Sequence, residues 1–317
     1  MMRMRAYLES LKTRGHVGDA PLLERDALRE LASRSRHLGA LDGTRPEAAW
    51  PRLGDTRSPY RGSGLDYEDS RPYQPGDELR HINWRLSARS GTPQTKIFRE
   101  ERRPGVFVVV DRRGSMRFGT RTRPKCTQAA ICTALIAFAA RDRGASVGGL
   151  LLAEEIQWLG PGRGDRAVFR LIAGAAAPCP PRSGHPWPGL PGLLPRLRLA
   201  LPAGTALYLV SDFGDLGSED RRALLQLATR HAVAAICITD PAEAVLPAAG
   251  PVTLVSDRDG SERIVDTDDP ALRADFAAAA ARARETRRRL LTGGGADYCE
   301  VGTTEPRPEA RIPWLGD

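Results

Sequence analysis

Lysine is scarce in this chain of 317 residues. Its 47 basic residues include only three lysines, Lys12, Lys96 and Lys125, so the net charge of +8 comes almost wholly from arginine. A basic protein can bind nucleic acid or an anionic membrane. Here the arginines are scattered among 39 acidic residues and do not gather in one stripe. Nucleic-acid binding is therefore not expected, and it ranks third among the possible functions.

Cysteine pairs and clustered histidines are also lacking. The chain has an odd number of cysteines, no C-x-x-C spacing, and five widely dispersed histidines. This pattern does not fit a disulfide framework or a zinc site, and it favours reduced thiols in a cytoplasmic protein. The five cysteines are Cys126, Cys132, Cys179, Cys237 and Cys299.

Long apolar runs are missing as well. The first residues include arginines but no apolar core of signal-peptide length. Nowhere do about eighteen uncharged apolar residues follow one another, as a membrane-spanning helix requires. The longest candidate, residues 129–140, is too short and is interpreted as a buried helix. We expect a soluble cytoplasmic protein without a transmembrane segment.

From Pro104 onward, apolar strands alternate with helical segments. Near-continuous Val, Leu and Ile strands that alternate with helices predict an α/β fold, a mostly parallel sheet covered by helices on both faces. The expected strands are 106–110, 147–152, 206–210, 233–239, 252–255 and 298–301. The expected helices are 127–141, 166–176, 219–231 and 270–291. The segment 178–202 is rich in proline and glycine and is predicted to be a surface loop.

The last of these helices has clear boundary signals. Asp269 can cap it, and three glycines from Gly293 end it. Its spacing of apolar residues predicts one buried side. That side would consist of Leu272, Phe276, Ala280, Ala283 and Leu290.

The residues before Pro104 suggest two further parts. Apolar positions at helical spacing predict a helix over 22–41, and residues 43–64 are rich in Pro, Gly and Arg, as irregular chain is. We therefore expect an N-terminal helical arm (1–45), a segment packed on the main domain (46–103), the α/β domain (104–303) and a C-terminal tail (304–317).

Carboxylates follow several of the expected strands. Asp111 ends V-F-V-V-V-D, Asp212 ends L-Y-L-V-S-D, and Asp240 follows A-I-C-I-T. The carboxyl ends of parallel strands meet at one edge of a sheet, which we call the rim, and ligands bind there in open α/β sheets. Carboxylate and hydroxyl oxygens are ligands that Mg²⁺ prefers. The Gly-rich loop 160–165 lacks the spacing of a Walker A or dinucleotide-binding motif.

A second motif lies upstream, where residues 71–89 read R-P-Y-Q-P-G-D-E-L-R-H-I-N-W-R-L-S-A-R. Pro75 and Gly76 favour a type II turn. Asp77 can cap the following segment or pair with Arg80. Ile82 and Trp84 both favour burial, and we expect Trp84 to be buried between this segment and the main domain.

These two motifs together resemble the bacterial family called domain of unknown function 58, whose second half is a von Willebrand factor A-like domain. The resemblance covers about residues 55–303. The matching positions of the upstream motif are Arg71, Tyr73, Gly76, Asp77, Arg80, Ile82, Trp84, Ser87 and Ala88. The upstream motif serves either to pack against the main domain or to bind a partner.

The resemblance implies a metal-ion-dependent adhesion site, whose first loop reads D-x-S-x-S. Asp111 matches its first Asp, Ser115 its last Ser and Asp212 its later Asp. Arg113 stands where the first Ser belongs, and no Thr matches the remaining loop. An arginine there removes a hydroxyl ligand and adds a fixed positive charge. We expect a degenerate site without cofactor, in which Arg113 pairs with Asp111 or Asp212; bound Mg²⁺ is the alternative.

The resemblance also implies association with a MoxR-type AAA+ ATPase. We expect a non-enzymatic adaptor that acts with such an ATPase, and with a client protein, in assembly or maturation of protein complexes. Arg112, Arg113 and Arg117 would meet a partner carboxylate at the rim, because guanidinium groups bind carboxylates without a metal. The runner-up is a Mg²⁺-dependent phosphoester hydrolase that uses Asp111 and Asp212. Ser115 lacks the G-x-S-x-G setting of a nucleophile.

Overall fold

A computed structural model describes residues 22–38, 66–74, 79–99, 105–178, 189–255 and 262–315. The chain divides into two units, of which residues 54–103 form the smaller. The larger unit holds the rest of the described chain and contains the sheet. Each unit is described by itself.

The larger unit is built on a six-stranded sheet in the order β10-β7-β6-β3-β4-β5. All neighbouring strands are parallel except β5, which pairs antiparallel with β4 at one edge. The strands are β3 (Val106–Asp111), β4 (Val147–Leu152), β5 (Ile156–Gly162), β6 (Ala206–Ser211), β7 (Ala232–Thr239) and β10 (Asp297–Gly302). Strands β3, β4 and β6 are buried along their whole length, which is why their sequences are continuously apolar. The predicted α/β class is confirmed.

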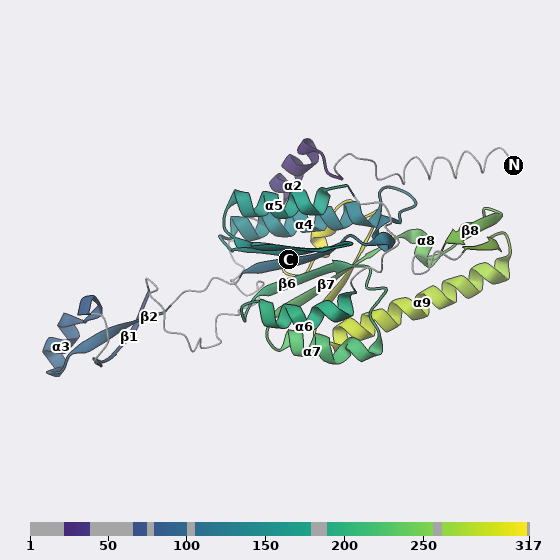
Figure 1. The fold of residues 1–317 in the computed structure, drawn as a ribbon. Helices are drawn as coiled ribbons and strands as arrows, with labels where there is room; N and C mark the ends of the chain where they lie inside the picture. The colour runs from purple at the N-terminus through teal and green to yellow at the C-terminus, as the bar shows by residue number, and fades with distance from the viewer. Residues whose placement is uncertain are drawn as a thin grey trace. The chain divides into compact units, whose positions relative to one another are not determined.

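Helices cover both faces of this sheet (Figure 1). One face carries α2 (Arg25–Leu38), α4 (Lys125–Asp142) and α5 (Asp165–Ala176); the other carries α6 (Leu190–Ala200), α7 (Arg221–Ala228) and α9 (Pro270–Gly293). A hydrophobic core lies on each face of the sheet, and successive residues of β3 point alternately into the two cores. Val106, Val108 and Val110 face the α4 side, whereas Phe107 and Val109 face the α6 side. Helix α4 lies at the centre and is buried almost throughout.

Two elements form in segments that were predicted to be loops because they are rich in proline and glycine. Helix α6 lies within the segment predicted to be a surface loop, and its Leu190, Leu193, Leu194 and Leu197 form a buried stripe at helical spacing. Strand β5 includes part of the Gly-rich segment predicted to be a loop. It is an edge strand, where proline and glycine are tolerated.

Two further strands lie outside the main sheet. Strands β8 (Pro251–Val255) and β9 (Glu262–Asp266) pair with each other as an antiparallel ribbon, next in the chain after the short helix α8 (Pro241–Ala244). The strand expected at 252–255 therefore forms, but in a separate hairpin.

Helix α9 extends beyond the sheet (Figure 1). Only Leu290 and Leu291 of this helix are buried. Leu272, Phe276 and Ala280 are partly exposed and Ala283 is exposed, so most of the predicted buried side is wrong. The apolar spacing is real, but the N-terminal part of the helix has no sheet to cover.

The chain after β10 packs back onto the α4 face. Ile312 and Leu315 are buried in the core on that face, and the Tyr208 hydroxyl donates to the Pro313 carbonyl at 3.2 Å. The segment 304–317, which was expected to be a C-terminal tail, thus contributes the side chains of Ile312 and Leu315 to the core. No helix in the described part of the chain is long and apolar enough to cross a membrane.

The smaller unit is a two-stranded antiparallel ribbon with a short helix. Strand β1 (Asp66–Pro72) pairs with β2 (Gln94–Arg99), and the helix α3 (Trp84–Ser90) lies between them in sequence after a single 3-10 turn (Leu79–His81). Asn83 caps α3 and Gly91, at φ 71°, ends it. The helix buries none of its residues.

Trp84 is 71% exposed within the smaller unit, so that unit alone does not bury it, and its burial against the main domain remains a prediction. It occupies the first position of α3, and a two-stranded ribbon offers too few apolar atoms to enclose an indole ring. Ile82, two residues earlier, is buried as expected and forms a bridge to Thr95.

Candidate functional site

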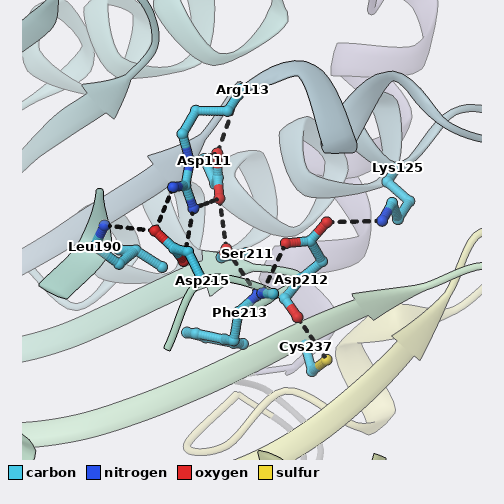
Figure 2. A network of polar contacts seen from close by, with 10 residues as sticks. Asp111, Arg113, Lys125, Leu190, Ser211, Asp212, Phe213, Asp215 and Cys237 are labelled. Carbon is cyan, nitrogen blue, oxygen red and sulfur yellow. Dashed lines mark hydrogen bonds and ion pairs between the residues drawn. The ribbon is translucent and has the colours of Figure 1, made fainter. Parts of the chain in front are cut away.

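The candidate site lies where β3 and β6 end side by side. These strands are neighbours in the sheet, with β4 and β5 on one side and β7 and β10 on the other. The strand order changes direction at this point, and ligands bind at such a position in open α/β sheets. Asp111 is the last residue of β3, and Asp212 directly follows β6. Both carboxylates therefore lie at the rim (Figure 2).

Asp111 is fully buried and holds Arg113 against itself. The backbone N and Nε of Arg113 each donate to its Oδ1 at 3.0 Å, and Nη2 donates to Oδ2 at 2.7 Å. The Ser211 hydroxyl donates to the same Oδ2 at 2.5 Å. Both oxygens of Asp111 are thus occupied by groups of this chain.

Arg113 also contacts a second carboxylate, that of Asp215. Nη1 and Nη2 both donate to Asp215, the latter at 3.1 Å, and Asp215 also accepts from the backbone N of Leu190 at 2.9 Å. The guanidinium therefore bridges the loop after β3 and the loop after β6 (Figure 2). Bidentate pairing of this kind fixes geometry as well as charge.

Lys125 plays a similar part beside Asp212. Its Nζ donates to Asp212 Oδ2 at 2.8 Å and to Glu243 Oε1 at 2.6 Å, and the residue is only 1% exposed. It is the first residue of α4. Lys125 was missed in the sequence analysis; the signal available was a rare lysine at the head of a highly apolar helix.

We call these seven residues the rim network: Asp111, Arg113, Lys125, Ser211, Asp212, Asp215 and Glu243.

The third strand-end acid, Asp240, has a structural role. Its carboxylate accepts from Thr120, from the Thr303 hydroxyl at 2.7 Å and from the backbone N of Ala242 at 3.0 Å. The backbone N of Asp240 in turn donates to Glu243 at 2.9 Å. Asp240 thus caps α8 and holds Glu243 in place to receive Lys125.

Burial and charge act in opposite directions on these groups. Burial raises the pKa of Asp111, and the contacts with Arg113 and Ser211 only partly offset this. Burial would also raise the pKa of Asp212, but the Lys125 charge and hydrogen bonds outweigh it, so this pKa is lowered. Burial would lower the pKa of Lys125, yet the charges of Asp212 and Glu243 raise it. The ammonium group therefore stays protonated at neutral pH.

The expected cluster of Asp111, Ser115 and Asp212 is confirmed in its geometry. Asp111 and Asp212 are close enough to affect each other's charge, and a hydrogen bond from Ser115 contributes to the lowered pKa of Asp212. Arg113 lies within 2.7 Å of Asp111, as expected for a salt bridge.

The three rim arginines have different surroundings. Arg112 follows β3 but is buried, and its Nη2 donates to the carbonyl oxygens of Ala177 and Pro178, so it is not exposed to meet a partner carboxylate as expected. Its side chain points away from that of Asp111 because successive residues alternate in direction. Arg113 is engaged by two carboxylates of its own chain, so it is not free to meet a partner carboxylate. Arg117 has two nitrogens, Nε and Nη2, that are buried without a hydrogen-bond partner, whereas Arg112 has only Nε in that state.

The donor set of the rim network does not fit a divalent cation. Two of its members are cations that already contact all four carboxylates. In the described part of the chain, no group of three or more His, Cys, Asp and Glu residues is placed to hold a metal ion. A metal at this position would have to displace a guanidinium or an ammonium group.

The upstream motif has local structural roles for some of its residues. The Ser87 hydroxyl donates to the Asn83 carbonyl at 2.9 Å and accepts from the backbone N of Gln94 at 2.8 Å, which ties α3 to β2. Arg71 donates to the Pro72 carbonyl, and the backbone N of Tyr73 donates to the Pro93 carbonyl. Trp84 and Ala88 are exposed. The predicted turn at Pro75 and Gly76, the residue Asp77 and the side chain of Arg80 lie outside the described residues.

Fold and site together define a mixed α/β protein with a mostly parallel sheet and a charged network at its topological switch point. More particularly, the chain belongs to the family described as "Protein of unknown function DUF58", which matches residues 69–286. The family predicted from the sequence motifs is confirmed.

Relatives and solved structures were found as well. Uncharacterized proteins of Mycobacterium bovis and Mycobacterium tuberculosis are 31% identical over 265 residues, which cover 83% of this chain and 80% of theirs. An aerotolerance-related membrane protein from Bacteroides fragilis is similar in structure, with a TM-score of 0.44, 14% identity, and coverage of 65% of this chain and 96% of that one. The conserved hypothetical protein BatB from Bacteroides thetaiotaomicron has a TM-score of 0.41, 15% identity, and coverage of 63% and 91%.

Proposed function

We propose that this protein is a non-enzymatic adaptor that acts with a MoxR-type AAA+ ATPase, and with a client protein, in the assembly or maturation of protein complexes. We place it in the cytoplasm, because the four cysteines among the described residues are free thiols, as in a reducing compartment. We further infer that the larger unit is a von Willebrand factor A-like domain.

Two features support the domain assignment. The six strands, counted along the larger unit, follow the order 3-2-1-4-5-6, with the third strand antiparallel at the edge. The loop after the first strand reads D-R-R-G-S, which keeps the outer two positions of the D-x-S-x-S motif in Asp111 and Ser115. The sequence resemblance and the strand order therefore point to the same domain type.

The observation that carries the adaptor proposal is the unsatisfied guanidinium of Arg117. Its Nε and Nη2 are shielded from solvent yet have no partner, which is costly for a charged donor. Phe118, the next residue, is 44% exposed. An arginine with free donors beside an exposed aromatic ring on the rim matches the composition of interface anchors. We propose that a carboxylate of the partner completes the hydrogen bonds of Arg117.

The hydrolase alternative gains no support from the rim network. Asp111 and Asp212 would have to bind the metal or activate water, but Asp111 is held by Arg113 and Asp212 by Lys125. The oxygens of Asp111 and Asp212 already accept hydrogen bonds from groups of this chain, so neither carboxylate is free to bind a metal ion or to orient a water molecule. Binding is therefore the better-supported activity.

Binding to the ATPase is the direct test. The purified chain would be immobilised and exposed to a MoxR-type ATPase from the same organism under ATP-trapping conditions. Loss of a buried charge pair at an interface costs about 2–5 kcal/mol, so Arg117→Ala should weaken binding by about 30-fold or more. Arg29→Ala, which changes an exposed arginine on α2, is the matched control and should bind like the unmutated protein. Absence of binding by the unmutated protein would refute the proposal.

A further inference from the structure

We propose that the rim network is a cation site whose cations are permanently supplied by the protein itself, with Arg113 and Lys125 taking the place of a divalent metal ion. The inference rests on the contacts of these two side chains and does not depend on the partner proposed above.

The first step of the argument is the charge at the site. Four carboxylates, those of Asp111, Asp212, Asp215 and Glu243, meet at or next to the strand ends, where they would repel one another in the absence of cations. Clusters of acids in such a place ordinarily require a bound cation or protonation. Here each of the two basic side chains contacts two of the acids.

The second step concerns distances and burial. Lys125 Nζ lies 2.8 Å from Asp212 and 2.6 Å from Glu243, and Arg113 Nη2 lies 2.7 Å from Asp111. Both basic side chains are withdrawn from solvent, with 2% and 11% of their side-chain surface exposed. Burying a charge is unfavourable unless it is paired, so these cations remain inside because of the carboxylates.

The third step is the position of Lys125 at the head of α4. A positive charge at a helix N-terminus opposes the helix dipole, and an acid is normally preferred there. The lysine is therefore in an unfavourable place on its own helix, and its contacts with Asp212 and Glu243 must outweigh this. This chain has only two other lysines, and this one lies at a helix N-terminus, where a positive charge is unfavourable. Its presence there indicates that the site requires a positive charge.

The inference predicts a latent metal site. The double variant Arg113→Ser, Lys125→Ala removes both internal cations and leaves the carboxylates of Asp111 and Asp212 with the Ser115 and Ser211 hydroxyls, oxygen ligands that Mn²⁺ or Mg²⁺ prefers. Removal of the cations destabilises the variant through carboxylate repulsion, and metal binding reverses that loss.

Thermal unfolding and calorimetry, each with MnCl₂ or with EDTA, test this directly. The unmutated protein should show no saturable Mn²⁺ binding and the same Tm in both buffers. The double variant should gain about 5 °C or more in saturating Mn²⁺. Adding Asp212→Asn to the double variant should reduce that gain, which ties it to the rim network.

Three outcomes would overturn the proposal. One is stoichiometric binding of Mn²⁺ by the unmutated protein that is lost in Asp111→Ala. Another is a folded double variant that is indifferent to Mn²⁺. If the double variant does not fold in either buffer, Lys125→Ala, which retains Arg113, decides: stabilisation by Mn²⁺ supports the proposal, and its absence contradicts it.

Discussion

Arg113 and Lys125 each connect loops that follow different strands. Arg113 joins the end of β3 to the loop after β6, and Lys125 joins α4 to the loop after β6 and to α8. Because each cation has two acidic partners, loss of one partner leaves a buried charge only partly compensated. The rim should therefore be sensitive to single substitutions that preserve size but remove charge.

Asp111→Ala is expected to be strongly destabilising. Asp111 is fully buried and accepts three of the hydrogen bonds that Arg113 makes, so its loss leaves a partly unpaired guanidinium. Breaking a buried pair in this way costs about 3–5 kcal/mol of unfolding free energy. Urea denaturation measures this cost. Asp26→Ala, at an exposed pair on α2, is the control and should change little; a similar small change for Asp111→Ala would contradict the account.

The stability supplied by Asp212 should depend on pH. Because its pKa is lowered in the folded state, its contribution is present above the ordinary carboxyl pKa of 3.8 and is lost as pH falls through the folded value. Lys125, whose pKa is raised, contributes below its ordinary value of 10.5 and loses that contribution at higher pH. The difference in unfolding free energy between the unmutated protein and Asp212→Asn should be constant from about pH 5 to 9 and shrink below about pH 4. A difference that persists undiminished in acid would be inconsistent with this pairing.

Most residues of the rim network, but not all of them, could be predicted from the sequence. The acids at the strand ends followed from the apolar strand pattern, and the pairing of Arg113 followed from its place in the D-x-S-x-S loop that the family resemblance implies. The role of Lys125 was not predicted, because a lysine in the first turn of a helix is ordinarily solvated. Lys125 contacts Asp212 and Glu243, which are distant from it in the sequence. The burial of Arg112 was not predicted, because one residue of strand alternation decides which way a side chain points.

The elements that position the site are β3, β6 and α4, and their sequences specify them clearly. Buried parallel strands have continuous apolar runs, and α4 is apolar on all sides because it lies between the sheet and two other helices. Helix α6 was harder to predict because its prolines mimic a loop. Helix α9 was predicted, but its buried side depends on where the sheet ends, which the helix's own sequence does not encode.

Helix α9 offers a matched pair of substitutions. Leu291 is fully buried against the α6 side of the sheet, whereas Leu272 is partly exposed on the part of the helix beyond the sheet. Leu291→Ala should lower the unfolding free energy by about 2–5 kcal/mol, and Leu272→Ala by clearly less. Chemical denaturation of the two variants checks this. Equal losses would mean that both parts of the helix are packed alike.

The whole molecule is two units with very different cores. Of the described buried apolar residues, only Ile82 lies in the smaller unit, while the larger unit has a core on each face of its sheet. The resemblance to a family motif identified the smaller unit, but its packing on the main domain remains a prediction. Its exposed Trp84 and Leu79 are consistent with either packing or partner binding.

The larger unit should therefore fold without the smaller one. Replacing residues 54–103 by a flexible Gly/Ser linker removes no part of either core and leaves the rim network intact. We expect cooperative thermal unfolding with a midpoint within about 5 °C of the full chain. Loss of cooperative unfolding would show that the smaller unit is an integral part of the core.

The central claim is that side-chain cations, and not a metal ion, neutralise the acids at the switch point. A crystal structure of the unmutated protein grown in MnCl₂, with anomalous scattering collected for manganese, tests it most directly. The account predicts no anomalous peak between Asp111 and Asp212, with Lys125 Nζ within hydrogen-bonding distance of Asp212 and Glu243. A manganese ion coordinated by Asp111 and Asp212, with Lys125 or Arg113 turned away, would contradict it.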